Sequence, residues 1–203
     1  MSSRLKPARL VAGTGPRRVP SQARGRERVE RLLAAAAAEI GRRGYAEATM
    51  SAIARRAGTA IGSLYQFYPN KEALAEALRA RYAAAAAPLW RDLAKAAPQL
   101  TTAQLARELV QVSIEMIERC PVFAALVDAP RTEGSNRRRH QHRRRLAAVL
   151  RAGQPGLAPA QALSYAAVVQ YVLRGVPILT AARAPELEEL LAGYLKPRLE
   201  GPQ

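Results

Sequence analysis

The chain has 203 residues, of which 32 are lysine or arginine and 16 are aspartate or glutamate, so its formal net charge at pH 7 is +16. This length suffices for one sizeable core or two small ones, and the positive charge favours a polyanionic partner. A single cysteine, Cys120, excludes an intrachain disulfide, and no segment approaches the length and apolarity of a membrane span. Both features indicate a cytoplasmic protein that makes no use of a membrane.

The first 24 residues contain six basic residues, no acid, three prolines and two glycines. This composition predicts that residues 1–24 are disordered, and their apolar stretch is too short for a secretion signal. One interpretation is a basic arm that adds phosphate contacts or enters a minor groove. The alternatives are a solvated tail and a start codon placed too far upstream.

The next segment has the pattern of a first helix. Its apolar residues recur at helical spacing from Val29 to Ile40, and glycines follow at 41 and 44. The pattern predicts a helix that ends at these glycines.

A pair of short helices is predicted between Thr49 and Pro69. Thr49 can accept a hydrogen bond from an orphan backbone N–H and so open a helix that runs through Ala57. Gly58 can take the positive φ of a sharp turn, and a second helix from about 60 to 68 then stops before Pro69. The pattern is a helix-turn-helix, for which an ordinary helical hairpin is the alternative.

The second of these helices has an inner and an outer face. Leu64 and Tyr68 are four residues apart and are expected to pack inward. The positions left on or near the outer face are Ile61, Gly62, Ser63, Tyr65, Gln66 and Phe67.

The string from 49 to 74 resembles the helix-turn-helix of the TetR family of bacterial transcriptional regulators, whose pattern runs roughly T-x-x-x-I-A-x-x-A-G-V-S-x-G-T/S-L-Y-x-Y/H-F-x-x-K-E-x-L. The matching residues are Thr49, Ile53, Ala54, Ala57, Gly58, Gly62, Ser63, Leu64, Tyr65, Lys71, Glu72 and Leu74. With the helix before it, the resemblance covers roughly residues 28–81.

The resemblance implies a role for each outer residue on double-stranded DNA. Phosphates or bases would contact Ser63, Tyr65 and Phe67, a backbone phosphate would bind Lys71, and Thr49 would offer a backbone or hydroxyl contact. Sequence readout would fall to Ile61, Gly62 and Gln66, because glutamine can pair with adenine and an aliphatic tip can meet a thymine methyl.

Three positions depart from the family pattern. Thr59 and Ala60 replace an aliphatic residue and a capping serine, so we expect a less well capped turn. Phe67 precedes Tyr68, whereas the family has tyrosine or histidine before phenylalanine. Phe67 thus lacks a phosphate-binding polar group, and the Tyr68 hydroxyl must find a partner or reach the surface.

Beyond residue 70 the chain reads as helix interrupted by prolines, without a strand pattern. Helices are predicted near 71–96, 101–119, 121–129, 135–152, 159–183 and 185–199. The expected fold is therefore all-α, with an N-terminal three-helix head at 25–81 joined to an antiparallel helical bundle at 82–203.

In the family, the second region binds a small molecule and forms the dimer. The resemblance places the homodimer contact at about 159–199. Its expected stripe is Leu163, Ala166, Ala167, Gln170, Tyr171 and Arg174, for which an intramolecular core helix is the alternative.

An unidentified small-molecule effector is expected in a cavity between the bundle helices. The candidate lining residues are Tyr82, Trp90, Leu109, Val112, Met116, Phe123, Leu126 and Tyr165. They contain no acid or base and so favour an apolar or aromatic effector, and the alternative for each is an ordinary core position.

The run from Asn136 to Arg145, NRRRHQHRRR, spreads around a helix and forms no stripe. We expect a solvated, mobile junction there, and the alternatives are an anionic effector site, such as an acyl-coenzyme A phosphate, and a second nucleic-acid contact. His140 and His142 point to different helix faces among arginines, which disfavours a metal site.

Two function classes compete with a dimeric, ligand-responsive repressor acting on a palindromic operator. An enzyme is disfavoured, because both histidines lie in the arginine run and no catalytic triad, carboxylate pair or phosphate loop accompanies them; no cofactor is expected either. A non-specific nucleic-acid packaging protein would also explain the net charge, and only sequence-selective binding separates the two.

Overall fold

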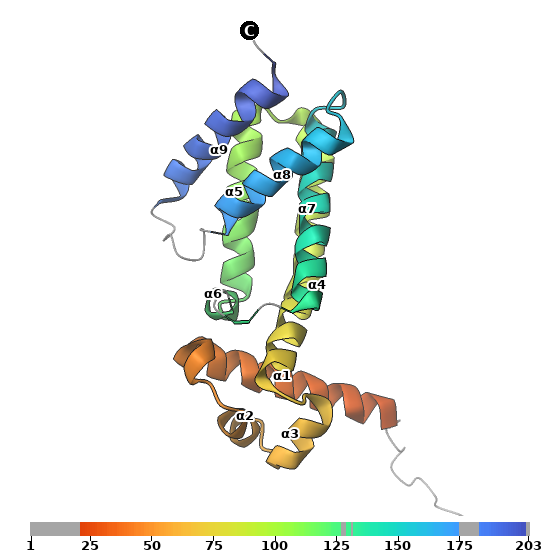
Figure 1. The fold of residues 1–203 in the computed structure, drawn as a ribbon, viewed down its shortest axis with the longest axis vertical. Coiled ribbons are helices and arrows are strands. Elements are labelled where there is room, and N and C mark those ends of the chain that lie inside the picture. Colours follow the sequence, from red (N-terminus) through yellow and green to blue (C-terminus); the bar gives the residue numbers. More distant parts are fainter. Residues whose placement is uncertain (1–20, 127–128, 131, 175–182, 202–203) are drawn as a thin grey trace, which may run out of the picture.

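The computed structural model describes residues 21–126, 129–130, 132–174 and 183–201, and within these ranges the chain forms helices and no strand. The predicted all-α class is confirmed. A small head lies at one end of the molecule and an upright bundle at the other (Figure 1). The helices are α1 (Ser21–Glu47), α2 (Met50–Arg56), α3 (Ile61–Phe67), α4 (Lys71–Ala96), α5 (Thr102–Arg119), α6 (Val122–Ala125), α7 (Glu133–Gly153), α8 (Pro159–Leu173) and α9 (Ala184–Leu199).

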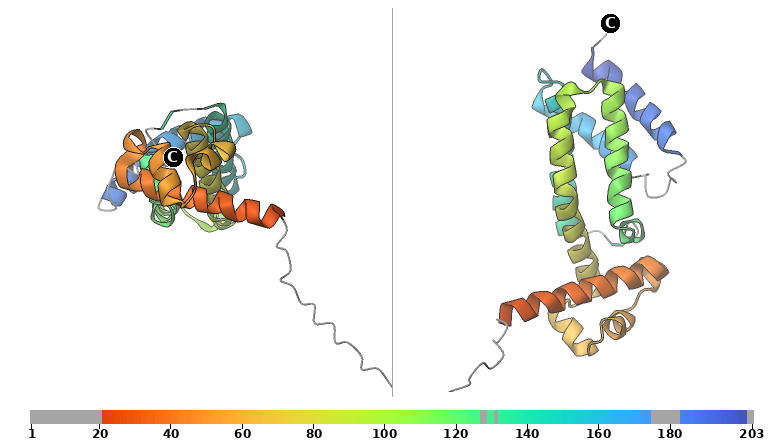
Figure 2. Two further views of the ribbon diagram at one scale, coloured as in Figure 1. Left: turned by 90° about the horizontal axis from the view of Figure 1, so that it is seen from below. Right: turned by 180° about the vertical axis from the view of Figure 1, so that it is seen from behind.

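The head consists of α1, α2, α3 and the first turns of α4. Figure 2 shows α1 lying across the end of the bundle, with α2 and α3 on its far side. The head has its own core, to which each of its helices contributes. Its largest fully buried side chains are Leu32, Ile40, Ile53, Leu64 and Leu74.

Local sequence accounts for the helix boundaries in the head. Thr49 Oγ1 accepts the backbone N–H of Ala52 at 3.2 Å and starts α2, and Asn70 Oδ1 accepts that of Ala73 at 2.8 Å and starts α4. Gly58, at φ 63°, makes the turn between α2 and α3. Ala60, at the start of α3, supplies no side-chain cap.

The first helix differs from its predicted bounds at its start. It begins at Ser21, so residues 21–24, predicted to belong to the disordered arm, are helical; residues 1–20 lie outside the described ranges. At the other end Gly44, at φ 79° and ψ 165°, breaks the helix where the glycines predicted its end, and a short separate turn follows to Glu47. Glycine adopts this positive φ at little steric cost, so it can end a helix within a single residue.

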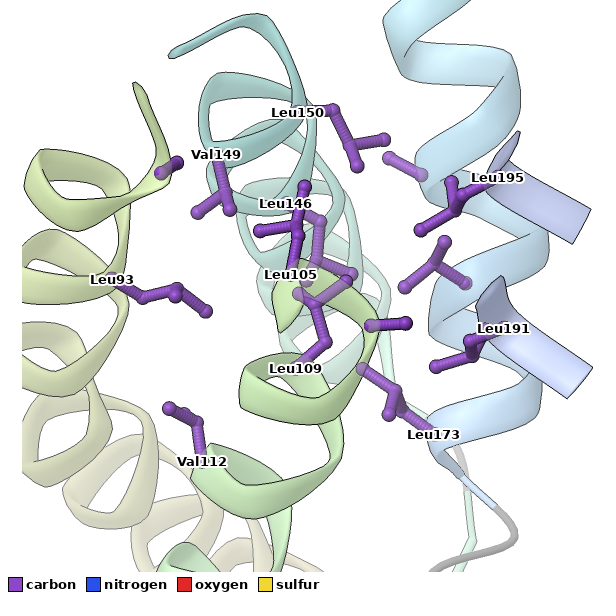
Figure 3. Packing of buried hydrophobic residues seen from close by; sticks show 14 of the residues in the cluster. Leu93, Leu105, Leu109, Val112, Leu146, Val149, Leu150, Leu173, Leu191 and Leu195 are labelled. Atoms are coloured by element: carbon purple, nitrogen blue, oxygen red, sulfur yellow. The ribbon is translucent and has the colours of Figure 1, made fainter. Parts of the chain in front are cut away.

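The bundle is formed by α4, α5, α7, α8 and α9. The most extensive packing joins α5 to α9, α7 to α8 and α4 to α7. Figure 3 shows leucine and valine side chains from these helices meeting in one core, among them Leu105, Leu146 and Leu195. Because α4 contributes to both cores, it connects the head mechanically to the bundle.

Two helices beyond the head, α6 and α8, are shorter than predicted. The structure limits α6 to Val122–Ala125, where the sequence predicted a helix over 121–129. It ends α8 at Leu173, where the prediction ran to 183, and residues 175–182 lie outside the described ranges. A glycine at 175 and a proline at 177 follow α8, and both disfavour helix although the surrounding residues are apolar.

Candidate functional site

The outward face of α3 exposes large apolar and aromatic side chains. The exposed fractions are 42% for Ile61, 47% for Tyr65 and 37% for Phe67. Gly62 and Gln66 are exposed beside them, while Leu64 on the opposite side is fully buried. One helix thus presents aliphatic, aromatic and amide groups on a single exposed surface.

The other predicted contact residues of the head vary in exposure. Thr49 is exposed, and its hydroxyl is used as the cap of α2. Ser63 is half-buried. Tyr68 is also half-buried against the core of the head, and burial, together with the charge of Glu30, raises the pKa of its hydroxyl.

Lys71 makes contacts inside the head that the sequence did not reveal. Its Nζ donates hydrogen bonds to the carbonyl oxygens of Tyr45 at 2.7 Å and Ala46 at 2.9 Å, and it lies 4.5 Å from the centre of the Tyr45 ring. The Tyr45 hydroxyl donates to Glu72 at 3.2 Å, and burial and the Glu72 carboxylate raise the pKa of Tyr45 to about 12. Lys71 therefore joins the start of α4 to the end of α1.

Glu39 is a second residue that sequence reasoning missed. Its side chain is buried and forms ion pairs with Arg43 at 2.8 Å, Arg56 at 3.1 Å and Arg42 at 3.2 Å. Burial acts to raise the pKa of Glu39, but the Arg56 hydrogen bond and the three positive charges outweigh it and lower the pKa. The Arg56 contact holds α2 against α1.

A cavity of about 220 Å³ lies near the head, between α4, α5, α7 and the C-terminal end of α8. Its apolar lining includes Tyr82, Trp90, Met116, Ile117, Phe123 and Leu126. The rings of Tyr82 and Phe123 stack at 4.4 Å between centroids. The Tyr82 hydroxyl donates to the carbonyl of Met116, and burial raises its pKa.

The remaining wall of the cavity is basic. Its arginines are Arg79, Arg138, Arg139, Arg145 and Arg174, and no acidic residue of the described ranges lines it. His142 lies edge-on to Trp90 at 4.9 Å between ring centroids. Burial, and secondly the charge of Arg145, lowers the pKa of His142 to about 4, so this histidine is neutral at pH 7.

The cavity and the head share residues. Leu126 and Ala129 line the cavity and are also buried in the core of the head. Arg79 of α4 donates to the carbonyl oxygens of both, at 2.9 Å and 2.8 Å. A molecule that entered the cavity would therefore touch the surface on which the head rests.

A family model described as "Bacterial regulatory proteins, tetR family" matches residues 32–78, from the buried face of α1 into the first turns of α4. The head therefore matches the TetR family in sequence. The resemblance in the helix-turn-helix string is thereby confirmed, and a comparison with curated protein sequences gave no match.

Solved structures extend the similarity beyond the TetR-type head to the whole fold. A TetR-like transcriptional regulator from Rhodococcus sp. RHA1 is 18% identical, with a TM-score of 0.60 over 91% of this chain and 100% of that one. FadR from Bacillus subtilis, solved with stearoyl-CoA, is 16% identical, with a TM-score of 0.58 over 86% and 100%. The multidrug binding protein EbrR, solved with imidazole, is 20% identical, with a TM-score of 0.62 over 82% and 94%. The chain has the fold of TetR-family transcriptional regulators.

In the described part of the chain, no helix is both long enough and apolar enough to cross a membrane. The same ranges contain no group of three or more histidine, cysteine, aspartate or glutamate side chains that could hold a metal ion.

The structure brings together five of the eight residues proposed from sequence for the cavity, namely Tyr82, Trp90, Met116, Phe123 and Leu126. Leu109 and Val112 do not line it, because they point into the bundle core. Tyr165 packs at 6.4 Å against the ring of Tyr194 instead. Helical spacing identified buried positions but could not tell a cavity wall from a core.

The arginine run was the main signal that sequence reasoning misjudged. It lies within α7, as the predicted helix over 135–152 required, but it is not a fully solvated junction, because Arg138, Arg139, Gln141, His142 and Arg145 all line the cavity. Thr132 and Ser135 form a capping box that starts α7 just before the run, and this pair was visible in the sequence.

The stripe predicted for the dimer contact divides between two sides of α8. Ala166 and Gln170 are buried in their own chain, and Gln170 donates to the carbonyl of Arg139 at 3.0 Å. Leu163 and Tyr171 are exposed, as is Val168, which the predicted stripe did not include.

Proposed function

We propose that this protein is a sequence-specific DNA-binding transcriptional regulator, a repressor that acts as a dimer on a palindromic operator and responds to a small molecule. The proposal assigns residues 25–81 to DNA binding and residues 82–203 to effector binding and dimerisation. The observation that carries it is the exposed face of α3, where Ile61, Tyr65 and Gln66 lie on a head that matches the TetR family. A helix presented in this way fits the major groove.

The DNA-facing residues divide by chemistry. Tyr65, Ser63 and Thr49 offer hydroxyl groups and Lys71 a positive charge, which suit phosphates. Ile61, Gly62 and Gln66 suit base edges. Two of the three donors of the Lys71 ammonium group are engaged by backbone carbonyls, which leaves one for a phosphate.

A second copy of the chain is the proposed partner of the exposed apolar face of α8. Leu163 and Val168 are each 40% exposed and Tyr171 is 78% exposed, and on α9 Leu190 is 53% exposed. Leu163, Val168 and Tyr171 fall within an arc of about 140° on α8. Two heads related by a twofold axis would read half-sites about 34–36 Å apart or a multiple of that spacing.

The proposed switch runs from the cavity to the head through α4 and the segment around Leu126. Arg79 holds the carbonyls of Leu126 and Ala129, and these two residues support the head. An effector that displaced this contact would tilt α4 and change the spacing of the two heads. The stearoyl-CoA and imidazole complexes of the similar structures support a ligand site in this type of bundle.

Selection from random-sequence double-stranded DNA with the full chain tests the proposal. We expect the enriched sequences to share an inverted repeat. Tyr65→Ala, which changes no charge, should weaken binding to that repeat by at least about tenfold and leave the dimer intact in light scattering.

The matched control is Arg107→Gln on α5, an exposed charge outside the head. It should leave binding to the selected repeat unchanged. If no motif were enriched, and Arg107→Gln weakened binding as much as Tyr65→Ala, the protein would be a non-specific packaging protein.

A further inference from the structure

The cavity has two chemically distinct ends, and they lie along α4. The stacked rings of Tyr82 and Phe123 lie towards one end, and the edge-on pair of Trp90 and His142 lies towards the other. Arg145 acts on His142 with its charge and reaches the carbonyl of Ala83, so its guanidinium lies between the two aromatic pairs. Tyr82 and Trp90 are eight positions apart on the helix, which corresponds to about 12 Å along its axis. A molecule that used both ends would be elongated.

The positive charges of the cavity are not equally available to a ligand. Arg138 forms an ion pair with Glu76, and Arg79 lies 3.9 Å from the same carboxylate and donates to three backbone carbonyls. Both are engaged at the end nearer the head. Arg145 contacts the carbonyl of Ala83 at 3.4 Å, a long bond that uses one of its five donors.

Trp90 adds an unusual feature to the cavity wall beside His142. It is only 2% exposed, and its indole N–H has no hydrogen-bond acceptor among the described residues. A buried donor without an acceptor is rare in a folded protein, so such a group calls for an explanation. An acceptor on a bound molecule would satisfy it.

No acidic residue of the described cavity wall neutralises the charge of Arg145. The low pKa of His142 keeps this neighbour neutral at pH 7, so it adds no second positive charge that would compete for an anion. An anionic oxygen group meets both requirements, an acceptor for an N–H and a partner for a guanidinium, and a carboxylate is the smallest such group and best suits a cavity of about 220 Å³.

We infer that the effector is an aryl-alkyl carboxylate, a small molecule in which a short apolar chain separates an aromatic ring from a carboxylate. Its carboxylate accepts hydrogen bonds from Arg145 and the Trp90 indole, and its ring lies near Tyr82 and Phe123. Only the regulatory role of this molecule, implied by the term effector, rests on the proposed function. Its binding in the cavity does not. The cavity has a volume of about 220 Å³, which is smaller than the about 300–1,000 Å³ of typical ligand pockets. The bound molecule must therefore be small.

Trp90 is the only tryptophan of the chain, so its fluorescence reports on the cavity directly. The test titrates the full chain, without DNA, with 4-phenylbutyrate, 4-phenylbutan-1-ol and 4-phenylbutylamine, which share one apolar body. We expect a saturable change in Trp90 emission, with the acid binding at least about tenfold more tightly than the alcohol and the amine not at all.

Two arginine variants on the same helix locate the carboxylate. Arg145→Gln should weaken binding of the acid by about tenfold or more and leave binding of the alcohol unchanged. Arg144→Gln removes an exposed charge next to it that does not line the cavity, and should bind the acid as the natural chain does. Trp90→Phe, followed by calorimetry, provides a second variant that keeps an aromatic ring and removes the N–H; it too should bind the acid more weakly.

The inference would be overturned if the alcohol bound as tightly as the acid, if Arg145→Gln and Trp90→Phe bound the acid like the natural chain, or if the acid gave no saturable signal up to its solubility limit. None of these results depends on DNA. An unsuccessful operator selection would therefore contradict the proposed function alone, and an absent carboxylate preference would contradict this inference alone.

Discussion

Arg138 on α7 and Glu76 on α4 form an ion pair between the wall of the cavity and the helix that leaves the head. Thr132, the N-cap of α7, donates a second hydrogen bond to the same carboxylate at 2.8 Å. Burial opposes ionisation of Glu76, but these two hydrogen bonds and the charges of Arg138 and Arg79 prevail and lower its pKa. The contact therefore fixes the start of α7 on α4 just above the head.

A double-mutant cycle on this pair should reveal its coupling energy. We expect Glu76→Gln and Arg138→Gln each to lower the free energy of unfolding by about 1–3 kcal/mol, because each leaves a half-buried polar partner without its charge-assisted bond. The double variant should lose less than the sum of the two, as measured by urea denaturation followed by circular dichroism.

Glu133→Gln is the control for this cycle, since Glu133 is 95% exposed and lies 3.9 Å from Arg137 on the same helix. Its effect should stay within about 0.5 kcal/mol. Strictly additive effects of the Glu76 and Arg138 substitutions would show that the two side chains are not coupled in solution.

Lys71 should have separable effects on stability and on DNA binding. Lys71→Met removes two hydrogen bonds to the end of α1, so we expect a loss of about 1–2 kcal/mol in the free energy of unfolding. If Lys71 also contacts a phosphate, the slope of log K against log salt for the selected operator should fall by about one.

Lys95→Met, an exposed lysine near the other end of α4, is the control for both measurements. It should change the free energy of unfolding by less than about 0.5 kcal/mol, and it should leave the slope of log K against log salt unchanged. A stability loss in Lys71→Met with an unchanged salt slope would make Lys71 a purely structural residue.

The head could be predicted from sequence more fully than the bundle, for a physical reason. Thr49, Gly58 and Asn70 act within three or four residues of their own positions, through caps and a tight turn, and such local effects are written directly in the sequence. The similarity of the string to a known pattern added proposed roles for the outer residues, which no periodicity could supply.

The cavity was only half predictable, because it depends on how distant helices are rotated against one another. Met116 and Val112 are both apolar and lie four residues apart on α5, yet Met116 lines the cavity and Val112 lies in the core. The arginines of α7 were misjudged for the same reason. Nothing in a run of like charges shows that Arg138 meets Glu76, an acid 62 positions away in the chain.

The exposed face of α8 should control the oligomeric state. We expect Tyr171→Glu combined with Leu163→Glu to weaken self-association by about a hundredfold or more, because the proposed contact would bury two unpaired charges. Light scattering over a range of concentrations measures the effect. The variant should still bind a single half-site, but its affinity for the full inverted repeat should be lower than that of the dimer.

Ala148→Glu, which adds the same charge to an exposed position of α7, is the control and should leave association unchanged. A double α8 variant that stayed dimeric at the same concentrations would place the contact elsewhere on the chain.

His142 should make the stability of the fold depend on pH in the mildly acidic range. Its pKa lies near 4 in the folded chain, against an ordinary value of 6.5, so the unfolded chain binds a proton that the folded one does not. Its stabilising contribution is therefore complete above pH 6.5 and is lost progressively as the pH falls towards 4, with a slope that approaches about 1.4 kcal/mol per pH unit.

Replacing this side chain should remove that part of the pH dependence. Between pH 7 and pH 5, the free energy of unfolding of His142→Gln should fall less steeply than that of the natural chain in urea titrations, whereas His140→Gln, which removes the exposed histidine of the same helix, should follow the natural chain. Parallel pH curves for His142→Gln and the natural chain would mean that His142 stays accessible to protons. The surroundings of His142 would then be open to solvent, because burial and, secondly, the charge of Arg145 are what lower the pKa of this ring.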